Sequence, residues 1–314
     1  EGADYVFYLP ADTPSNARRF LDIVHPEIAI FIKYEFWINL LSELRRRKVR
    51  SYIVSAIFRR NSVFFRPYGA MWRQALETFD TLFVQNVESK RLLSEIGFDN
   101  VVVAGDTRFD RVAQIAAAAQ RVETIERFRG GGRLFVAGST WGPDEEILLP
   151  LVNANPDVKF VIAPHEMDEG RIAHLMRDAK GGAVRYTQCD AATRFDDVQV
   201  LVLDTMGMLS SVYGSATWAY VGGGFGVGIH NTLEAATFGL PIAFGPNYGK
   251  FKEARDMVSL GCAVSVRTAG ELAAWFAPLR DDEETLRRAS RTAKDYTARN
   301  QGATGIILRS IFNS

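Results

Sequence analysis

Residues 221–249 read VGGGFGVGIHNTLEAATFGLPIAFGPNYG, and this stretch decides the fold class. A short apolar strand runs into the glycine-rich segment 222–228, a short helix follows over 233–238, and a second apolar strand begins at Pro241. Glycines in such a turn permit positive φ angles and a close approach to the main chain. A strand, a glycine turn and a helix in this order are typical of an α/β domain with a parallel sheet.

The residues after the glycines indicate what this turn binds. Asn231 and Glu234 stand three residues apart and therefore share one face of the first helical turn. Free N–H groups at a helix start suit a phosphate, and a carboxylate accepts two hydrogen bonds from a sugar diol. These features favour a sugar nucleotide. The alternative is a packing turn in which Glu234 only interacts with the helix dipole, and the stretch alone leaves both interpretations open.

The composition excludes several classes of protein. Lys+Arg and Asp+Glu balance at 37 each, so we expect no nucleic-acid partner. Cys189 and Cys262 are far apart, which fits a reducing compartment and excludes a disulfide scaffold. No His, Asp or Glu cluster has the spacing of metal ligands, so we expect no metal site. The sequence contains no nucleophile elbow either. The sequence contains no apolar run near the ~20 residues that span a bilayer.

Strands and helices alternate along the chain on both sides of the glycine run 130–132. The first series begins with a strand expected at Tyr5–Leu9, and the second begins at Leu134. This alternation predicts two doubly wound, Rossmann-like lobes that face each other across a cleft. We expect a first lobe over 1–129, incomplete at its start, a second lobe over 130–285, and C-terminal helices over 286–314 that return to the first lobe.

Polar side chains follow two of the strands expected in the first lobe, where ligands bind in such sheets. Glu35 stands beside aromatic residues, and Arg108 follows a glycine turn. A carboxylate here serves as a base or holds a basic partner, and a guanidinium stabilises phosphate charge. The alternatives are a helix-start acid for Glu35 and an Arg–Asp surface pair for Arg108.

Three further turns follow strands of the second lobe. Ser139 and Thr140 either donate to a phosphate or cap the next helix. His165, after Pro164, either contacts a base or phosphate or has a structural role in its turn. The segment Met206–Met208 either contacts a nucleobase through its main chain or fills gaps in the core.

One stretch of the first lobe mixes cations with aromatic side chains. The residues concerned are Arg59, Arg60, Arg66 and Arg73 among Phe58, Phe64, Phe65, Tyr68 and Trp72. Charges set among exposed aromatic side chains are typical of a surface that contacts anionic lipid, and the high density of aromatic residues favours this interpretation. The alternative is a solvated helix face that lies over a core.

Taken together, these turns resemble the 3-deoxy-D-manno-octulosonic acid (Kdo) transferase family, GT-B glycosyltransferases that place Kdo on lipid A precursor. The resemblance spans nearly the whole chain and depends on short motifs in a fixed order. The motifs are Tyr8-Leu9-Pro10-x-Asp12-x-Pro14, Glu35-Phe36-Trp37-x-Asn39, Gly105-x-x-Arg108-Phe109-Asp110, Ser139-Thr140, Pro164-His165, Asp204-Thr205-Met206-Gly207, and Gly222-Gly223 with His230-Asn231-x-Leu233-Glu234 and Gly245-Pro246.

The resemblance implies an inverting transfer of Kdo from CMP-Kdo to a lipid A precursor in lipopolysaccharide biosynthesis. It implies a membrane-associated enzyme at the cytoplasmic face of the bacterial inner membrane, with the first lobe on an anionic surface and no cofactor. Glu35 and Arg108 would support the transition state. The donor site would comprise Ser139, Thr140, Pro164, His165, Met206, Gly207, Met208, Gly223, His230, Asn231, Thr232, Leu233 and Glu234.

The sequence departs from the family pattern at several of these positions. Arg108 replaces a usual Lys, Pro164-His165-Glu166 stands for Pro-Arg-His, Met208 replaces a Glu and Ile38 a Pro. The family's general base lies in a Gly-Glu segment upstream of the Tyr-Leu-Pro motif, and we expect it to be absent from this chain. The alternatives are another GT-B enzyme that uses a uridine diphosphate sugar, and a non-catalytic nucleotide- or lipid-binding module.

Overall fold

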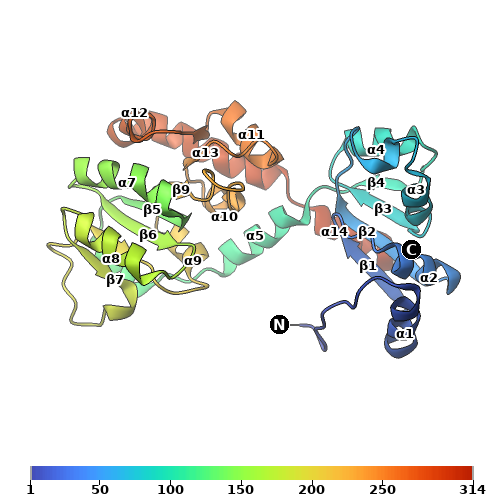
Figure 1. Ribbon diagram of the computed structural model, residues 1–314. Coiled ribbons are helices and arrows are strands. Elements are labelled where there is room, and N and C mark those ends of the chain that lie inside the picture. The colour runs from blue at the N-terminus through green and yellow to red at the C-terminus, as the bar shows by residue number, and fades with distance from the viewer. Residues whose placement is uncertain (1, 313–314) are drawn as a thin grey trace. The chain divides into compact units, whose positions relative to one another are not determined.

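The computed structural model describes residues 2–312, which form two compact units (Figure 1). The first unit comprises 2–110 together with 300–312, and the second comprises 111–299. Each unit contains one sheet in which every recorded strand pair is parallel. The predicted α/β class with parallel sheets is therefore confirmed.

The first unit is a four-stranded sheet with helices on both faces. Its strands stand in chain order, β1 (Ile28–Ile32), β2 (Arg50–Ala56), β3 (Thr81–Val84) and β4 (Val101–Val103). Its helices are α1 (Pro14–Val24), α2 (Ile38–Arg46), α3 (Ala70–Leu76), α4 (Val87–Ser94) and α14 (Ala303–Phe312), with a 3₁₀ turn at Val63–Phe65, and α5 (Thr107–Ala118) runs on from it into the second unit.

Strand β2 separates the two cores of the first unit, because successive side chains of a strand point to opposite faces. Ile53 packs in the cluster that α1 to α4 cover, whereas Tyr52 and Val54 pack with Ile307 and Ile311 of α14. Helix α14 thus covers one face of this sheet.

The carboxylate of Asp110 holds the start of α14. It accepts hydrogen bonds from the main-chain N–H of Gly302 at 2.6 Å and of Thr304 at 2.8 Å. The Thr304 hydroxyl donates to the same carboxylate at 2.8 Å. Three donors from one turn fix where this helix begins on the first unit.

The second unit is a seven-stranded parallel sheet in the order β11-β10-β9-β5-β6-β8-β7. Its strands are β5 (Leu134–Thr140), β6 (Lys159–Pro164), β7 (Ala183–Arg185), β8 (Val200–Val202), β9 (Trp218–Val221), β10 (Ile242–Phe244) and β11 (Ala263–Ser265). Its helices are α6 (Glu123–Arg129), α7 (Gly142–Ala154), α8 (Glu169–Asp178), α9 (Leu209–Tyr213), α10 (Thr232–Thr237), α11 (Lys252–Leu260), α12 (Ala269–Asp281) and α13 (Glu283–Arg299), with a 3₁₀ turn at Tyr186–Gln188.

The strand order of this sheet reverses between β5 and β9, which is where ligands bind in open α/β sheets. The glycine-rich loop after β9 packs against the end of β5 at this point. A Cβ atom on Gly222 would lie 2.2 Å from the main-chain oxygen of Ser139, and one on Gly224 would lie 2.5 Å from the Cα of Gly245. The space beside these two glycines is therefore filled by main chain, as the packing interpretation expects.

The division of the chain differs from the boundary expected at 129/130. Helix α6 packs in the second unit, where Arg127 donates to the main-chain oxygens of Asp190 and Thr193 and Phe128 meets Phe195 edge-on. Gly130 has a φ of 60° and ends α6 in the left-handed conformation. The glycine run is thus a helix cap, which in sequence looks the same as a linker.

The C-terminal helices do not pack as one body. Leu286 and Ala289 of α13 lie in the core of the second unit, whereas α14 packs on the first unit. The strand expected at Tyr5–Leu9 does not form, and its residues Tyr5, Val6 and Phe7 are exposed. The short strand β7 was not expected, because its three residues show no apolar run.

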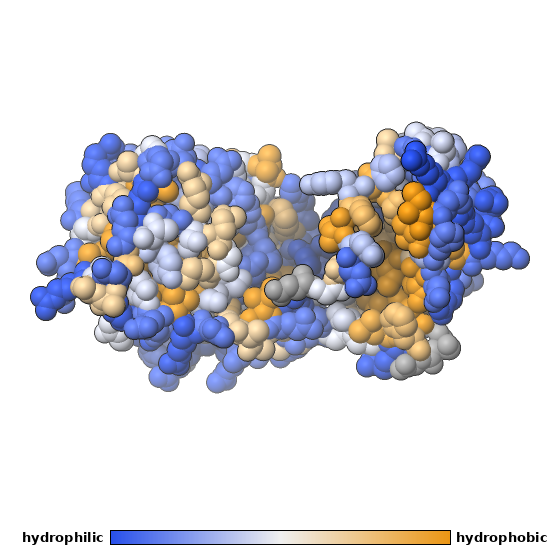
Figure 2. All heavy atoms as spheres, turned by 90° about the horizontal axis from the view of Figure 1, so that it is seen from below, coloured by the Kyte–Doolittle hydropathy of each residue, from blue (hydrophilic) through white to orange (hydrophobic). Residues whose placement is uncertain are grey.

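Apolar side chains also gather at the surface of the first unit, which stands at the right of Figure 2. Ile30 and Ile32 of β1 are exposed, and together with α1 they line a largely apolar pocket of about 440 Å³. Glu35 also lines this pocket.

Candidate functional site

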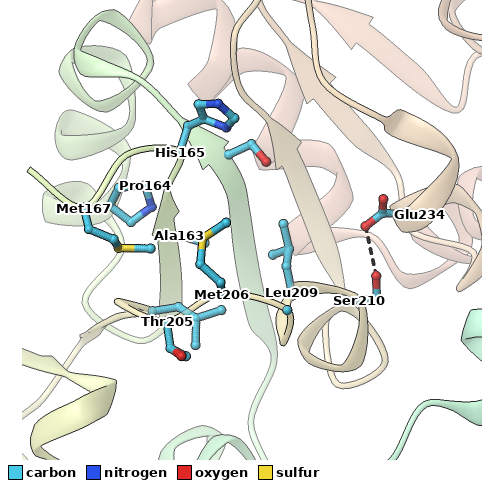
Figure 3. A pocket seen from close by; sticks show the side chains of 12 residues that line it. Ala163, Pro164, His165, Met167, Thr205, Met206, Leu209, Ser210 and Glu234 are labelled. Atoms are coloured by element: carbon cyan, nitrogen blue, oxygen red, sulfur yellow. Dashed lines mark hydrogen bonds between the residues drawn. The ribbon is translucent and has the colours of Figure 1, made fainter. Parts of the chain in front are cut away.

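A pocket of about 240 Å³ lies at the carboxyl ends of β5, β6 and β8 in the second unit. Figure 3 shows its lining side chains, with Glu234 and Ser210 joined by a hydrogen bond on one side and His165 on another. The lining residues are Ser139, Ala163, Pro164, His165, Met167, Leu203, Thr205, Met206, Gly207, Leu209, Ser210 and Glu234.

Six residues expected at the donor site line this one pocket. They are Ser139, Pro164, His165, Met206, Gly207 and Glu234. They come from four separate segments of the chain, and the parallel sheet brings these segments together because the carboxyl ends of its strands share one edge. The structure thus assembles about half of the expected residues around a single cavity.

The other expected residues lie outside the pocket lining. Thr140 is buried, and its hydroxyl donates to Glu145 at 2.9 Å, so it neither caps α7 nor faces the cavity. Met208 is the N-cap of α9, and Leu233 is part of the buried core. Thr232 is buried as well, and its hydroxyl has no hydrogen-bond partner.

Gly223, His230 and Asn231 also lie outside the pocket lining, and they contact neighbouring parts of the chain instead. Gly223 has a φ of 89°, and a Cβ there would meet the His230 ring at 2.8 Å. Its N–H donates to the buried carboxylate of Asp144 at 2.9 Å. Asn231 accepts from the N–H of Leu233 at 3.2 Å and so caps α10.

The Glu234 carboxylate is held from two sides. The Ser210 hydroxyl donates to its Oε2 at 2.9 Å, and the Asn231 amide donates to its Oε1 at 2.9 Å. Each carboxylate oxygen accepts up to two hydrogen bonds, so each keeps one acceptor site beyond these contacts. The group is half-buried at the pocket wall, where it is suited to receive two hydroxyls.

A missing side chain on β5 allows helix α9 to approach the pocket. A Cβ on Gly138 would lie 2.2 Å from the Tyr213 hydroxyl and 2.8 Å from the Leu209 side chain. Burial raises the pKa of the Tyr213 hydroxyl well above its usual range, and the charge of Glu234 acts in the same direction. Gly138 therefore lets α9 dock at the end of β5, which places Ser210 beside Glu234.

Three rings from distant segments lie against one another beside the pocket. The His165 ring lies 4.8 Å from the Trp141 ring and 4.3 Å from the His230 ring, centroid to centroid. The Trp141 indole N–H donates to Nε2 of His230 at 3.2 Å, which requires that nitrogen to carry no proton. Burial lowers the pKa of His230, and the neighbouring His165 adds to this effect while Asp144 opposes it.

We expect His230 to titrate below the ordinary imidazole pKa of about 6.5, and the shift to become smaller in His165→Asn. Burial remains in that variant, so part of the shift should persist. Because the folded-state pKa is lowered, the unfolded chain binds more protons, and stability should fall as the pH drops through the ordinary value. The pH dependence of the His230 ring signals in NMR measures this. A His230 pKa at or above the ordinary value would contradict the burial of this ring beside His165.

A buried ion pair ties α8 to the same edge of the sheet. Arg171 lies 2.6 Å from Oε1 of Glu145, whose side chain is only 3% exposed. The guanidinium also donates to the main-chain oxygen of Thr140 at 3.1 Å and lies over the Trp141 ring. The end of β5, the start of α7 and the start of α8 are therefore fixed by one set of contacts.

The two residues expected to act from the first unit have local partners. Oε2 of Glu35 accepts from the Trp37 indole at 2.7 Å, and the Glu35 side chain is exposed. Arg108 contacts the buried carboxylate of Asp106 at 2.8 Å. These contacts fix the orientation of both side chains, and their catalytic roles stay predictions.

The basic and aromatic stretch of the first unit differs from the expected lipid surface. Phe58 and Phe64 are buried in the core, and Tyr68 is exposed. Arg60 pairs with Glu95, and Arg73 donates to the main-chain oxygen of Phe64. The expectation of exposed aromatic side chains was wrong for Phe58 and Phe64, because their rings meet edge-on inside the core of the first unit.

Two kinds of feature are absent from the part of the chain that the structure describes. Residues 2–312 contain no group of three or more His, Cys, Asp or Glu side chains arranged to hold a metal ion. Over the same residues, no helix combines the length and the apolar character needed to cross a membrane.

Sequence reasoning missed Ser210, Met167 and Leu209 of the pocket. Met167 follows the His165 turn, and Leu209 and Ser210 follow the Met206–Gly207 turn, so longer windows after each strand would have included them. The hydrogen bond from Ser210 to Glu234 joins residues 24 positions apart, and no local sequence pattern predicts it.

Comparisons with known proteins test the resemblance to Kdo transferases. Residues 1–111 match the family model of 3-deoxy-D-manno-octulosonic-acid transferase (kdotransferase). The 3-deoxy-D-manno-octulosonic acid transferase of Bordetella pertussis is 27% identical over 97% of this chain and 73% of its own length. The resemblance to the Kdo transferase family is confirmed. The Rickettsia felis Kdo transferase is 23% identical over 84% of this chain, which spans 58% of that protein.

The fold is shared more widely than the Kdo transferase family. The crystal structure of UDP-GlcNAc 2-epimerase from Neisseria meningitidis, bound to UDP-GlcNAc, matches with a TM-score of 0.66 and 16% identity. The match covers 96% of this chain and 80% of the epimerase. At this identity it shows the fold alone, and it agrees with the GT-B class expected of a Kdo transferase.

Proposed function

We propose that this chain is a GT-B glycosyltransferase that moves Kdo from CMP-Kdo to a lipid A precursor, with inversion, in lipopolysaccharide biosynthesis. One observation carries the proposal: six residues that the family resemblance assigns to the donor site line a single pocket, although they come from four separate segments of the chain. The similarity to Kdo transferases over nearly the whole chain supports the choice of CMP-Kdo as the donor.

The pocket offers a distinct group for each part of CMP. Glu234 receives the ribose hydroxyls, because each of its oxygens keeps an acceptor site. Ser139 and His165 face the phosphate, and the main chain of Met206 and Gly207 contacts the cytosine. The usual family Arg after Pro164 is absent, so His165 is the one imidazole or cationic side chain of the described lining.

The remaining parts of the proposal concern the acceptor. Glu35 and Arg108 support the transition state from the first unit, and transfer needs no metal ion or cofactor. The enzyme works at the cytoplasmic face of the inner membrane and contacts its anionic surface through the first unit. Arg59, Arg66 and Tyr68 are exposed and would make this contact.

Calorimetric titration of the chain with CMP, UMP, UDP and AMP tests the donor assignment. We expect CMP to bind most tightly and Glu234→Ala to weaken it by about 10- to 100-fold, the loss of hydrogen bonds to a charged group. Glu166→Ala is the matched control, since Glu166 is an exposed carboxylate next to His165 that does not line the pocket.

Other results of this titration point to other functions. A preference for UDP would favour the enzyme that uses a uridine diphosphate sugar. If the folded chain binds none of these nucleotides, the proposal is contradicted. If Glu234→Ala and Glu166→Ala lose CMP affinity equally, the nucleotide does not bind in this pocket.

A further inference from the structure

Ser210 occupies a position that the family resemblance leaves without a role. It lies in the short helix α9 and lines the pocket, and its hydroxyl hydrogen is directed to Oε2 of Glu234. Asn231 occupies the opposite oxygen of the same carboxylate. The amide oxygen of Asn231 is already engaged by the N–H of Leu233, which fixes the orientation of its amide group.

This pair of contacts restricts how the Glu234 carboxylate can turn. A free glutamate side chain rotates about its last bond over a broad range. Here one donor on each oxygen defines the carboxylate plane and leaves one acceptor site on each oxygen. Two acceptor sites side by side match the two neighbouring hydroxyls of a ribose, whereas a single hydroxyl uses only one of them.

The rest of the pocket keeps Ser210 in place. Gly138 lets α9 approach the end of β5, and Tyr213, the last residue of α9, is buried. Helix α9 also packs against α10, which carries Glu234. The hydroxyl of Ser210 therefore depends on the docked helix, and a substitution at 210 removes one donor from Glu234 without removing a core side chain.

We propose that Ser210 is a positioning residue that holds the Glu234 carboxylate for the two ribose hydroxyls, so that the pocket selects a ribonucleotide over its 2′-deoxy form. This inference rests on the proposed function, because it takes the pocket as the nucleotide site. It concerns discrimination between two sugars, which a purely structural role of Ser210 would leave unchanged.

The test measures the affinities of CMP and 2′-deoxyCMP for the same protein by calorimetry. We expect the wild-type chain to prefer CMP by about tenfold or more. In Ser210→Ala the preference for CMP over 2′-deoxyCMP should fall to about threefold or less, because the loss of one hydrogen bond changes an affinity by about this factor. The affinity for 2′-deoxyCMP itself should change by less than about twofold. Ser210→Thr keeps the hydroxyl and should restore the ratio.

Ser211→Ala is the matched control, since Ser211 is a neighbouring hydroxyl on α9 that does not line the pocket. A Ser210→Ala variant that weakens CMP and 2′-deoxyCMP equally would overturn the inference, and so would a wild-type chain that binds both alike. Either result leaves CMP binding itself intact and the proposed function standing. No binding of either nucleotide by the folded wild type would overturn both.

Discussion

Gly222→Ala is expected to destabilise the second unit by about 3 kcal/mol or more, at the upper end of the usual cost of overpacking. The added Cβ would lie 2.2 Å from the main-chain oxygen of Ser139 and 2.7 Å from the Cα of Thr140. Both are backbone atoms of a central strand, so no side-chain rotation relieves the clash. The ends of β5 and β9 would have to separate, and the pocket wall at Ser139 would move with them.

The same loop provides the control for this prediction. A Cβ on Gly226 would have the main-chain oxygen of Gly223 as its nearest neighbour, at an ordinary 3.7 Å. Chemical denaturation of both variants gives their free energies of unfolding. Equal free energies of unfolding for Gly222→Ala and Gly226→Ala would show that the contact between the ends of β5 and β9 has room for a side chain. The packing there would then be looser than the structure indicates.

Arg171→Met is expected to cost about 3–5 kcal/mol, the range for removing one partner of a buried ion pair. Glu145 is almost fully buried, and the Thr140 hydroxyl would be its only remaining partner among the contacts described above. The charge would stay in a poorly solvated place without a counter-ion. The free energy of unfolding from denaturant titration measures the loss.

Two further variants separate the buried charge from other causes. Arg171→Met combined with Glu145→Gln removes the orphaned charge and keeps an acceptor for Thr140, so most of the stability should return. Arg177→Met, on the same helix, breaks an exposed pair with Asp178 and should cost under about 1 kcal/mol. A double variant as unstable as Arg171→Met alone would assign the loss to packing against Trp141.

The sequence was sufficient for the parts of the site that depend on single strands. Ser139, His165 and Glu234 each follow a recognisable apolar strand, and parallel sheets place such residues at one edge. Contacts between turns that are distant in the sequence could not be predicted. The ring contacts of Trp141, His165 and His230 join three loops that share no local pattern.

The sequence also could not distinguish uses of the same residue type. The glycines after β9 were compatible with a cradle for phosphate and with close packing, and only the neighbouring backbone atoms decide in favour of packing at Gly222 and Gly224. Phe58 and Phe64 look like surface aromatics between arginines, but both rings pack in the core of the first unit. Thr140 and Ser139 are adjacent, and the irregular end of β5 directs them to different partners.

The place of α14 in the chain sets the order in which the protein is completed as the ribosome makes it. Asp110 must wait for Gly302, 192 residues later, before its hydrogen bonds can form. Until then Tyr52, Val54 and Phe83 form an uncovered apolar face, while every strand of the second unit has already been made. The first unit to be translated is thus the last to be finished, and its open face is where a nascent chain would need protection by a chaperone.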